Sequence, residues 1–449
     1  MRDPQPQPSA TPRPHGRSIT LWAAIALVSG LAAVVLVAVV SCARTAPTPM
    51  TVRAYPYPGS ENLRQVDGGP RYYAKFPRSL PSDASYFPIG VWYESVLSGP
   101  DVEADKRAGL NLYVVLTANS DLPLIARSGM KVIAQHEEWR DRADAPGSEA
   151  IAGWLLADET DMQLKPRRGF ATMRSLSEAV STGDGRLRYN NYGKGVTFWN
   201  ADADAARYVN EFQDVVSADN YWFTDRDLCV PSQGGVLLAT GGKPLKPWRC
   251  HSAANYGRTV DRLRDLVEPP GSRPVWAFVE VGHPFRDSRW PSIKPAEVSA
   301  AVWSSLVHGA RGIVYFNHSF GGPAQTQHAL REPAYADVRM EVAKTNSRIR
   351  QLAPVLNAPF VERFTSTPAA VDTMTKRSGG HFYVFAASRA GDAQVAAFHV
   401  PCAGRVRVTV LDENRTLPML DGSFEDSFAD GNAVHIYRVD GSACWLPES

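Results

Sequence analysis

The chain has 449 residues, which is long enough for a large hydrophobic core and for more than one domain. Its formal net charge is only +2, and its Arg and Lys residues form no basic stripe, which argues against a nucleic-acid partner. Aromatic residues make up 10% of the chain and include 11 Trp, a content compatible with the stacking surfaces of a sugar-binding cleft.

The N-terminal region predicts export. A polar, Pro-rich opening leads into an apolar run over 19–40, which has the length of a signal peptide or of one membrane-spanning helix. The run ends in Val39-Val40-Ser41-Cys42, which resembles a bacterial lipobox, where a signal peptidase cuts before the cysteine and the thiol is lipidated. We therefore expect residues 1–42 to act as a lipoprotein signal that holds the chain, through Cys42, at the extracytoplasmic face of the cell membrane. An uncleaved membrane anchor and an ordinary cleaved signal are the alternatives.

The other four cysteines form two local pairs, Cys229 with Cys250 and Cys402 with Cys444. Paired cysteines in an exported protein are most simply disulfides. No cluster of His or Asp residues lies beside either pair at the spacing of metal ligands, so a metal site is not expected there. Nor does any motif in the chain call for a cofactor.

Residues 43–85 are rich in Pro, Gly and Tyr and show no sustained period, so we interpret them as a linker and an irregular lead-in. After them, predicted strands and helices alternate. The predicted strands cover 87–93, 111–116, 131–134, 151–158, 187–191, 215–221, 275–280 and 312–316. The predicted helices cover 100–109, 122–128, 166–181, 203–213, 253–267, 295–307 and 335–352.

Eight strands alternating with helices over residues 86–353 predict an α/β fold, a (β/α)8 TIM barrel. An open doubly wound sheet is the alternative, but no Gly-rich phosphate turn follows the first strand. Residues 354–449 change to short alternating runs broken by Gly, Asp and Pro, which predict a small antiparallel β-sandwich domain with strands over 360–364, 381–387, 394–400, 405–411 and 433–439. We expect this domain to pack on the barrel.

Two acidic strand ends carry the candidate chemistry. The strand 151–158 ends in Asp158 and is followed directly by Glu159, and the strand 275–280 ends in Glu280. Ligands bind at the carboxyl ends of the strands in parallel α/β sheets, so these acids lie where chemistry is usually done. A buried carboxylate without a partner is costly, so Glu280 must have partners or a role. For the first cluster the structural alternative is a helix cap formed by Thr160 or Asp161.

This arrangement resembles the large clan of (β/α)8 retaining glycosidases in which the acid/base follows strand four and the nucleophile ends strand seven. The run 309–316, Gly-Ala-Arg-Gly-Ile-Val-Tyr-Phe, also resembles their last strand, and a trailing β-sandwich is common among them. The resemblance covers the barrel and implies Glu159 as acid/base and Glu280 as nucleophile, two carboxyls that must stand about 5 to 5.5 Å apart across the sugar bond.

One position departs from the pattern of this clan. Many members carry Asn before the acid/base, where the amide binds the sugar 2-hydroxyl, and this chain has Asp158. An ionised Asp accepts a hydrogen bond but cannot donate one, so the contact to the substrate at carbon 2 is in question. The neighbouring carboxylate could also raise the pKa of Glu159, which suits an acid.

Other polar and aromatic residues near strand ends are candidates for substrate binding. Tyr221 could bond the nucleophile, as a Tyr often does in the resembled clan. The remaining candidates are His136, Glu137, Asn191, Asp219, His283, Asn317 and Trp92. The structural alternative for each is that it satisfies a loop backbone or packs at the barrel rim.

The sequence therefore predicts an exported, membrane-tethered retaining glycoside hydrolase that acts on an extracellular or cell-wall polysaccharide or glycoconjugate. One alternative is a sugar-binding surface protein on the same fold that has lost catalysis. Another is a metal-dependent barrel hydrolase that uses His136, Glu137, Glu159 and His283, although these residues lack a close ligand spacing such as His-x-His.

Overall fold

The computed structural model describes residues 63–238, 242–402, 405–440 and 444. The apolar run 19–40 and Cys42 lie outside these ranges. Within them, no helix has both the length and the apolar character needed to cross a membrane.

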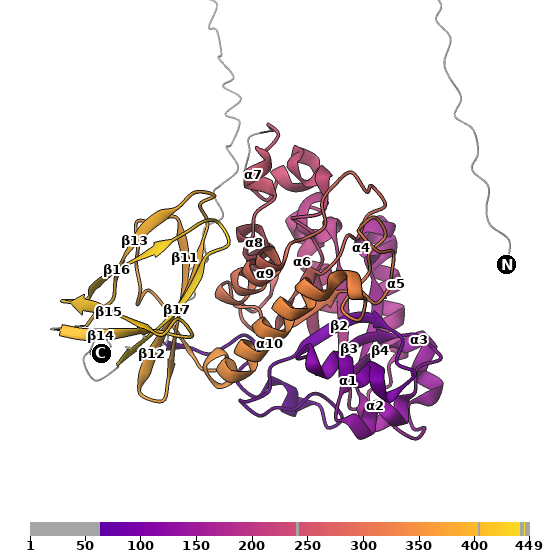
Figure 1. Cartoon of the computed structure of the whole chain (residues 1–449). Helices are drawn as coiled ribbons and strands as arrows, with labels where there is room; N and C mark the ends of the chain where they lie inside the picture. The colour runs from indigo at the N-terminus through magenta and orange to yellow at the C-terminus, as the bar shows by residue number, and fades with distance from the viewer. Residues whose placement is uncertain (1–62, 239–241, 403–404, 441–443, 445–449) are drawn as a thin grey trace, which may run out of the picture. The chain divides into compact units, whose positions relative to one another are not determined.

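Eight parallel strands close into a barrel, as the sequence predicts (Figure 1). They are β2 (Ile89–Glu94), β3 (Leu112–Leu116), β4 (Lys131–Gln135), β5 (Ile151–Asp158), β6 (Leu187–Tyr192), β7 (Val215–Ala218), β8 (Val275–Glu280) and β9 (Ile313–Phe316). Each strand pairs with the next, and β9 pairs with β2 to complete the circle. The carboxyl ends of all eight strands therefore meet around one mouth.

The long helices follow the strands as expected. They are α1 (Gly99–Arg107), α2 (Leu122–Ser128), α5 (Pro166–Ala179), α6 (Asp202–Glu211), α8 (Ala254–Leu266), α9 (Pro295–Val307) and α10 (Ala336–Leu356). Local chemistry fixes where they begin: α1 starts at a capping box in which the Ser98 backbone N–H donates to Asp101 at 2.9 Å. Three short helices, α3 (His136–Trp139), α4 (Thr160–Gln163) and α7 (Pro247–Cys250), lie in the loops after strands.

The barrel strands are apolar on both faces because both faces are covered. In β5, Leu155 belongs to the cluster that fills the barrel, whereas Trp154 and Leu156 pack under the surrounding helices. The amino-terminal end of the barrel is closed by the short 3-10 helix Tyr72–Lys75. There the Tyr73 hydroxyl accepts a hydrogen bond from Trp276 Nε1 at 3.1 Å inside the core. Access from outside is left to the mouth at the carboxyl end.

The C-terminal domain is one nine-stranded antiparallel sheet, with strand order β1-β10-β11-β12-β17-β14-β15-β16-β13. Its strands are β1 (Leu63–Arg64), β10 (Phe360–Val361), β11 (Val371–Ser378), β12 (His381–Ser388), β13 (Gln394–His399), β14 (Arg405–Val410), β15 (Arg415–Leu420), β16 (Ser423–Phe428) and β17 (Val434–Asp440). The sheet curls so that Phe398 of β13 contacts Tyr437 of β17, with ring centroids 5.4 Å apart. This curl gives the expected sandwich-like core.

Three findings complete the comparison with the sequence prediction. Both predicted disulfides, Cys229–Cys250 and Cys402–Cys444, are present. The sheet packs on the barrel helices, where Phe385 stacks on Trp303 with centroids 6.1 Å apart. Four strands of the sheet were not predicted: β11, β15 and β16, and also β1, which lies within the lead-in and is only two residues long.

Candidate active site

Glu159 occupies an unusual backbone position directly after β5. Its φ is +50°, in the left-handed region that costs a non-glycine residue about 1 to 2 kcal/mol. The pairing of β5 with β6 also shifts register between Leu155 and Asp158, which is a bulge of the kind that re-aims side chains near active sites. Backbone strain and a bulge thus coincide at the two acids that the sequence singles out.

Three carboxyl groups gather at this strand end, and we call Asp158, Glu159 and Asp219 the acid cluster. Asp158 Oδ1 accepts from Asn191 Nδ2 at 3.0 Å, and Asp219 Oδ2 accepts from the Tyr221 hydroxyl at 2.8 Å. Glu159 and Asp219 lie close enough to influence each other's ionisation, since burial and then the charge of Glu159 raise the pKa of Asp219. The other oxygen of Asp219, Oδ1, is buried and receives no hydrogen bond from any donor group of the described residues.

Burial is the main cause of raised pKa values throughout the acid cluster. It raises the pKa of Asp158 to about 7, with the charge of Glu159 adding to the effect and the Asn191 hydrogen bond opposing it. The pKa of Glu159 is also raised by burial and by the charge of Asp161. Burial, followed by the charges of Glu159 and Asp158, holds the pKa of Asp219 well above its usual value. Near neutral pH the cluster therefore retains protons, which is the property a general acid requires.

A chain of hydrogen bonds fixes the amide of Asn191. The Ser217 hydroxyl donates to Asn191 Oδ1 at 2.7 Å, and Ser217 in turn bonds the Tyr189 hydroxyl at 2.5 Å. The amide nitrogen of Asn191 is consequently turned toward Asp158. Neighbouring strands β6 and β7 thus hold one oxygen of Asp158 in place.

Asp161 has a structural role beside the acid cluster. Its carboxylate accepts backbone N–H groups from Gly193 at 3.2 Å and from Val196 at 2.7 Å, and so holds the turn after β6. Gly193 cannot carry a side chain, since an added Cβ would collide with Met162 and lie 3.2 Å from Glu159 Oε1. The backbone after β6 therefore closes directly over Glu159.

Glu280 ends β8 as predicted, but its side chain is 0% exposed. Its Oε2 accepts from the Tyr256 hydroxyl at 2.7 Å, and its Oε1 accepts from Thr224 Oγ1 at 3.0 Å. Burial raises the pKa of Glu280 to about 7 in spite of these hydrogen bonds. Both oxygens of the predicted nucleophile are thus occupied by the protein.

The tyrosine that donates to Glu280 is not the one that the sequence predicted. Tyr221, expected to bond Glu280, donates to Asp219 instead, and Tyr256 of α8 takes the place beside Glu280. No sequence signal marked Tyr256 or Thr224, because one lies on a helix and the other in a long loop.

Aromatic rings stand beside the acids at the ends of β2 and β9. Phe316 contacts Tyr221 with ring centroids 4.9 Å apart and His318 at 5.1 Å, and Tyr93 meets His318 at 5.7 Å. Tyr93 and Phe316 are half-buried, so part of each ring stays open for stacking on a sugar. Trp92, in contrast, is buried in the barrel interior against Phe278 at 5.3 Å and offers no exposed platform.

Several other predicted binding residues are used by the fold. His136 is buried against Trp154, which packs under the helices, and Glu137 is exposed on α3. His283 is buried and its Nε2 bonds the Trp290 carbonyl oxygen at 2.8 Å. No hydrogen bond found among the described residues joins these three side chains to the acid cluster.

Asn317 belongs to a second buried network outside the acid cluster. Its Oδ1 accepts from the Leu330 backbone N–H at 2.8 Å, and its Nδ2 donates to Glu94. Glu94 is fully buried at the end of β2 and pairs with His328 and, at 3.2 Å, with Arg331. Sequence reasoning missed Glu94, although it also ends an apolar strand. Both cations come from the segment before α10, so this carboxylate has structural partners.

The four residues of the metal-site alternative do not come together. In the part of the chain that the structure describes, the one grouping of three potential metal ligands is Cys229, Cys250 and His251. Two of its members are joined as a disulfide, which leaves no thiolate to bind a metal.

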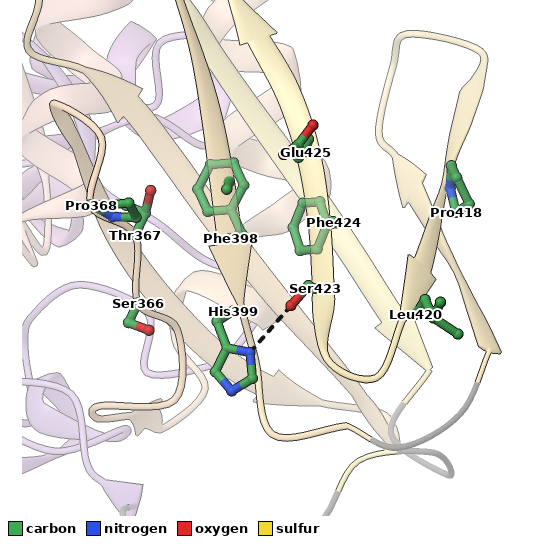
Figure 2. A pocket seen from close by; sticks show the side chains of 11 residues that line it. Ser366, Thr367, Pro368, Phe398, His399, Pro418, Leu420, Ser423, Phe424 and Glu425 are labelled. Atoms are coloured by element: carbon green, nitrogen blue, oxygen red, sulfur yellow. Dashed lines mark hydrogen bonds between the residues drawn. The ribbon is translucent and has the colours of Figure 1, made fainter.

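A separate hollow of about 790 Å³ lies in the C-terminal sheet (Figure 2). Phe398, His399, Ser423 and Phe424 of β13 and β16 form one side, and His399 Nδ1 lies 3.5 Å from Ser423 Oγ. Among its described lining residues the hollow has a single carboxylate, Glu425, so it lacks the paired carboxyls that acid–base hydrolysis of a glycoside uses.

Comparison with known proteins finds similarity of structure only. No protein-family model matches the chain, and no curated protein matches it in sequence. A solved structure described as a glycoside hydrolase aligns over 80% of this chain and 94% of its own, with 13% identity and a TM-score of 0.49. A family 5 glycoside hydrolase from Bacteroides vulgatus aligns over 80% and 91%, with 12% identity and a TM-score of 0.49. AbfB, a family 51 α-L-arabinofuranosidase from Bifidobacterium longum, aligns over 84% and 98%, with 10% identity and a TM-score of 0.47.

Proposed function

We propose that this chain is an exported, membrane-tethered retaining glycoside hydrolase acting on an extracellular or cell-wall polysaccharide or glycoconjugate. The observation that carries the proposal is the acid cluster at the mouth of the closed barrel, where Glu159 lies beside Asp158 and Asp219 and has a raised pKa. The half-open rings of Tyr93 and Phe316 beside it support a sugar as the ligand.

Glu159 acts as the acid and then the base. As the bond between the sugar and the leaving group breaks, the protonated Glu159 gives its proton to the leaving oxygen. Its carboxylate then removes a proton from the water that attacks the anomeric carbon. The raised pKa of Glu159 favours the protonated form that donates to the leaving oxygen.

Glu280 is the protein's own nucleophile in this proposal. Its side chain is 0% exposed, so the loop with Thr224 and the helix with Tyr256 must move before a sugar can reach it. This enclosure is also the observation that favours the second candidate function, a sugar-binding surface protein without catalysis.

Aryl glycosides with good and poor leaving groups test the role of Glu159. Glu159→Ala should lose much more activity on poor leaving groups, which need protonation, than on activated ones. Azide added to this variant should restore turnover of the activated substrate and give a glycosyl azide of retained configuration. An exposed acid on α1 provides the matched control, Glu103→Gln, which should behave as the parent. Equal activity of Glu159→Ala and the parent on poor leaving groups would overturn the assignment, and a parent that binds sugars but cleaves none would favour the second candidate.

A further inference from the structure

An exposed apolar surface lies on two loops at the carboxyl end of the barrel. Large hydrophobic side chains are exposed at eight positions of the described chain, and four of these lie on the loops after β6 and β7. The four, which we call the loop patch, are Trp199 (46% exposed), Val230 (40%), Val236 (60%) and Trp248 (65%). Loops that follow strand ends share one side of a barrel, so the loop patch stands on the same side as the acid cluster.

The loop after β7 is a folded element with its own buried anchors. The disulfide Cys229–Cys250 joins its ends, and the Leu245 backbone N–H donates to the Cys229 carbonyl oxygen at 2.7 Å. Leu237 and Leu245 are buried, whereas Val236, next to Leu237, is exposed. The exposure of Val236 is therefore a property of a fixed backbone.

The other loop is joined to this one. Trp199, which precedes α6, donates from its indole Nε1 to the Ser232 carbonyl oxygen at 2.8 Å. Trp248 lies on α7, which Figure 1 shows at the outer end of the barrel. Apolar side chains gathered on one exposed surface mark a site of interaction with a partner.

The charge of the loop indicates the chemistry of that partner. Residues 229–250 contain three cations, Lys243, Lys246 and Arg249, and no Asp or Glu. All three cations are exposed. An apolar surface surrounded by cations suits a partner that is apolar inside and anionic at its surface.

The exposed acids that flank the loop patch have basic partners. Asp227 lies 3.5 Å from Arg226, and Asp202, at the start of α6, lies 2.7 Å from Arg262. These acids are therefore neutralised locally, and the positive charge of the loop is left to attract an anionic partner.

A membrane with anionic lipids fits the loop better than a polysaccharide does. Tryptophan rings favour the level of the lipid head groups, aliphatic side chains enter the acyl boundary, and cations bind the phosphates. Sugar sites rely on carboxylates and amides that bind hydroxyl groups, and Gln233 is the one such side chain in the sequence 229–250. The two exposed valines also offer a sugar no ring on which to stack.

We propose that the loop patch docks on the surface of a membrane that contains anionic lipids. Val236 and Trp248 enter the bilayer interface, and the three cations of the loop meet lipid phosphates. This contact is additional to the predicted N-terminal anchor. A fully extended connection between Cys42 and Leu63 spans at most about 70 Å, so a chain anchored at Cys42 keeps the loop near the bilayer. The inference is independent of glycosidase activity.

The test measures amide exchange by mass spectrometry in the full chain, reconstituted in phosphatidylcholine vesicles with or without phosphatidylglycerol. Both kinds of vesicle hold the N-terminal apolar run, so a difference between them reports the loop. We expect 229–238 and 242–250 to exchange more slowly when phosphatidylglycerol is present. Lys243→Gln and Lys246→Gln should each lower this protection about fivefold, and added salt should weaken it in the parent.

Two valines of similar exposure provide a matched pair of variants. Val236→Asp places a charge against the acyl chains and should abolish the lipid-dependent protection of the loop. Val395→Asp makes the same change on β13, where Val395 is 64% exposed, and should leave the protection unchanged. Thermal unfolding in detergent checks that both variants are folded.

Three results would overturn the docking. They are equal protection of the loop in the two kinds of vesicle, protection that Val236→Asp retains, and protection of the detergent-solubilised chain by a soluble cell-wall oligosaccharide. The last result would assign the loop patch to a polysaccharide. None of these measurements uses turnover, so failure of the proposed function leaves the docking standing, and failure of the docking leaves the proposed function standing.

Discussion

At the scale of single residues, the acid cluster places function and stability in opposition. The pKa of Asp158 is about 7 in the folded chain, against an ordinary value of 3.8. The folded state therefore binds this proton more tightly than the unfolded state does. The bound proton therefore stabilises the fold fully below the ordinary pKa of 3.8, and this stabilisation is lost as the pH rises through about 7. The ionised form of Asp158 is thus disfavoured by its buried position.

Substitution of this acid by its amide should therefore stabilise the fold. We expect Asp158→Asn to raise the melting temperature at about pH 8, and to change it little at about pH 4, because the amide has no charge to bury. The amide oxygen can still accept from Asn191, so the local packing is kept. Thermal unfolding over this pH range, with Glu103→Gln as the control, measures the difference. A melting temperature below that of the parent at the higher pH would contradict the sign.

The enclosure of Glu280 supplies a second prediction about single residues. Tyr256→Phe removes the donor to Oε2 and leaves a buried carboxyl oxygen without a partner, at a cost of about 1 to 3 kcal/mol. Loss of this donor also raises the pKa of Glu280 further, so the destabilisation should be larger above about pH 7, where the parent carboxyl ionises, than at about pH 5.

A buried tyrosine on α6 offers a matched control for that measurement. Within the described part of the chain the Tyr208 hydroxyl is buried and has no hydrogen-bond partner, so Tyr208→Phe removes an oxygen without breaking a bond. Urea unfolding of the two variants at both pH values compares them directly. Equal free energies of unfolding for both variants would contradict the role assigned to Tyr256.

Position along the chain revealed the acids but not their partners. Asp158, Glu159 and Glu280 could be predicted because each ends or follows an apolar strand, and strand ends meet at the mouth of a barrel. The donors to Glu280, in contrast, come from a loop and from a helix face, and nothing in a single sequence marks which hydroxyl will meet a carboxylate. His136 and His283 are the opposite case. Both are polar residues near strand ends, but the fold uses them for packing and loop contacts.

At the scale of elements, a charged histidine joins the barrel to the sheet. His308, directly after α9, lies 2.7 Å from Asp261 of α8 and 3.2 Å from Asp372 of β11. Although burial opposes the charge, these two carboxylates raise the pKa of His308 to about 10. Its stabilising contribution is therefore complete below the ordinary value of 6.5 and is lost as the pH rises through about 10.

Removal of this charge should weaken the junction between the two domains in a pH-dependent way. We expect His308→Gln to cost about 1.5 to 3 kcal/mol at neutral pH, the range for hydrogen bonds to charged groups. The cost should shrink toward about pH 10, where the parent histidine also loses its charge. Unfolding free energies of His308→Gln, Asp372→Asn and the double variant give the coupling across the interface. A cost that does not change with pH would show that packing alone holds the junction.

Elements with strong periodicity were predicted best. Each barrel strand has both faces covered and so forms a continuous apolar run, which is easy to recognise. The sheet strands β11, β15 and β16 were missed because their patterns are weak: β15 contains Pro418, and β16 alternates with Ser, Glu and Asp. Pairing with neighbours, rather than local preference, makes these segments strands.

At the scale of the whole molecule, the sequence before the described residues makes its own prediction. If the cysteine of the lipobox-like run is the lipidation site, metabolic labelling with a fatty-acid probe should mark the parent chain, and Cys42→Ala should abolish the label and release the protein from the membrane. Labelling that survives the substitution would contradict this site, and an unlabelled protein that stays in the membrane would point to an uncleaved anchor.

The tyrosine-bearing 3-10 helix Tyr72–Lys75 has a consequence for turnover. Together with the side chains that fill the barrel, this helix closes the end opposite the acids, so the barrel is open at its carboxyl end alone. A cleaved sugar cannot leave through the amino-terminal end of the barrel. It must leave through the mouth by which the next substrate enters. Under the proposed function, product that stays at the mouth excludes substrate, so turnover should slow as product accumulates and recover when that product is diluted or consumed.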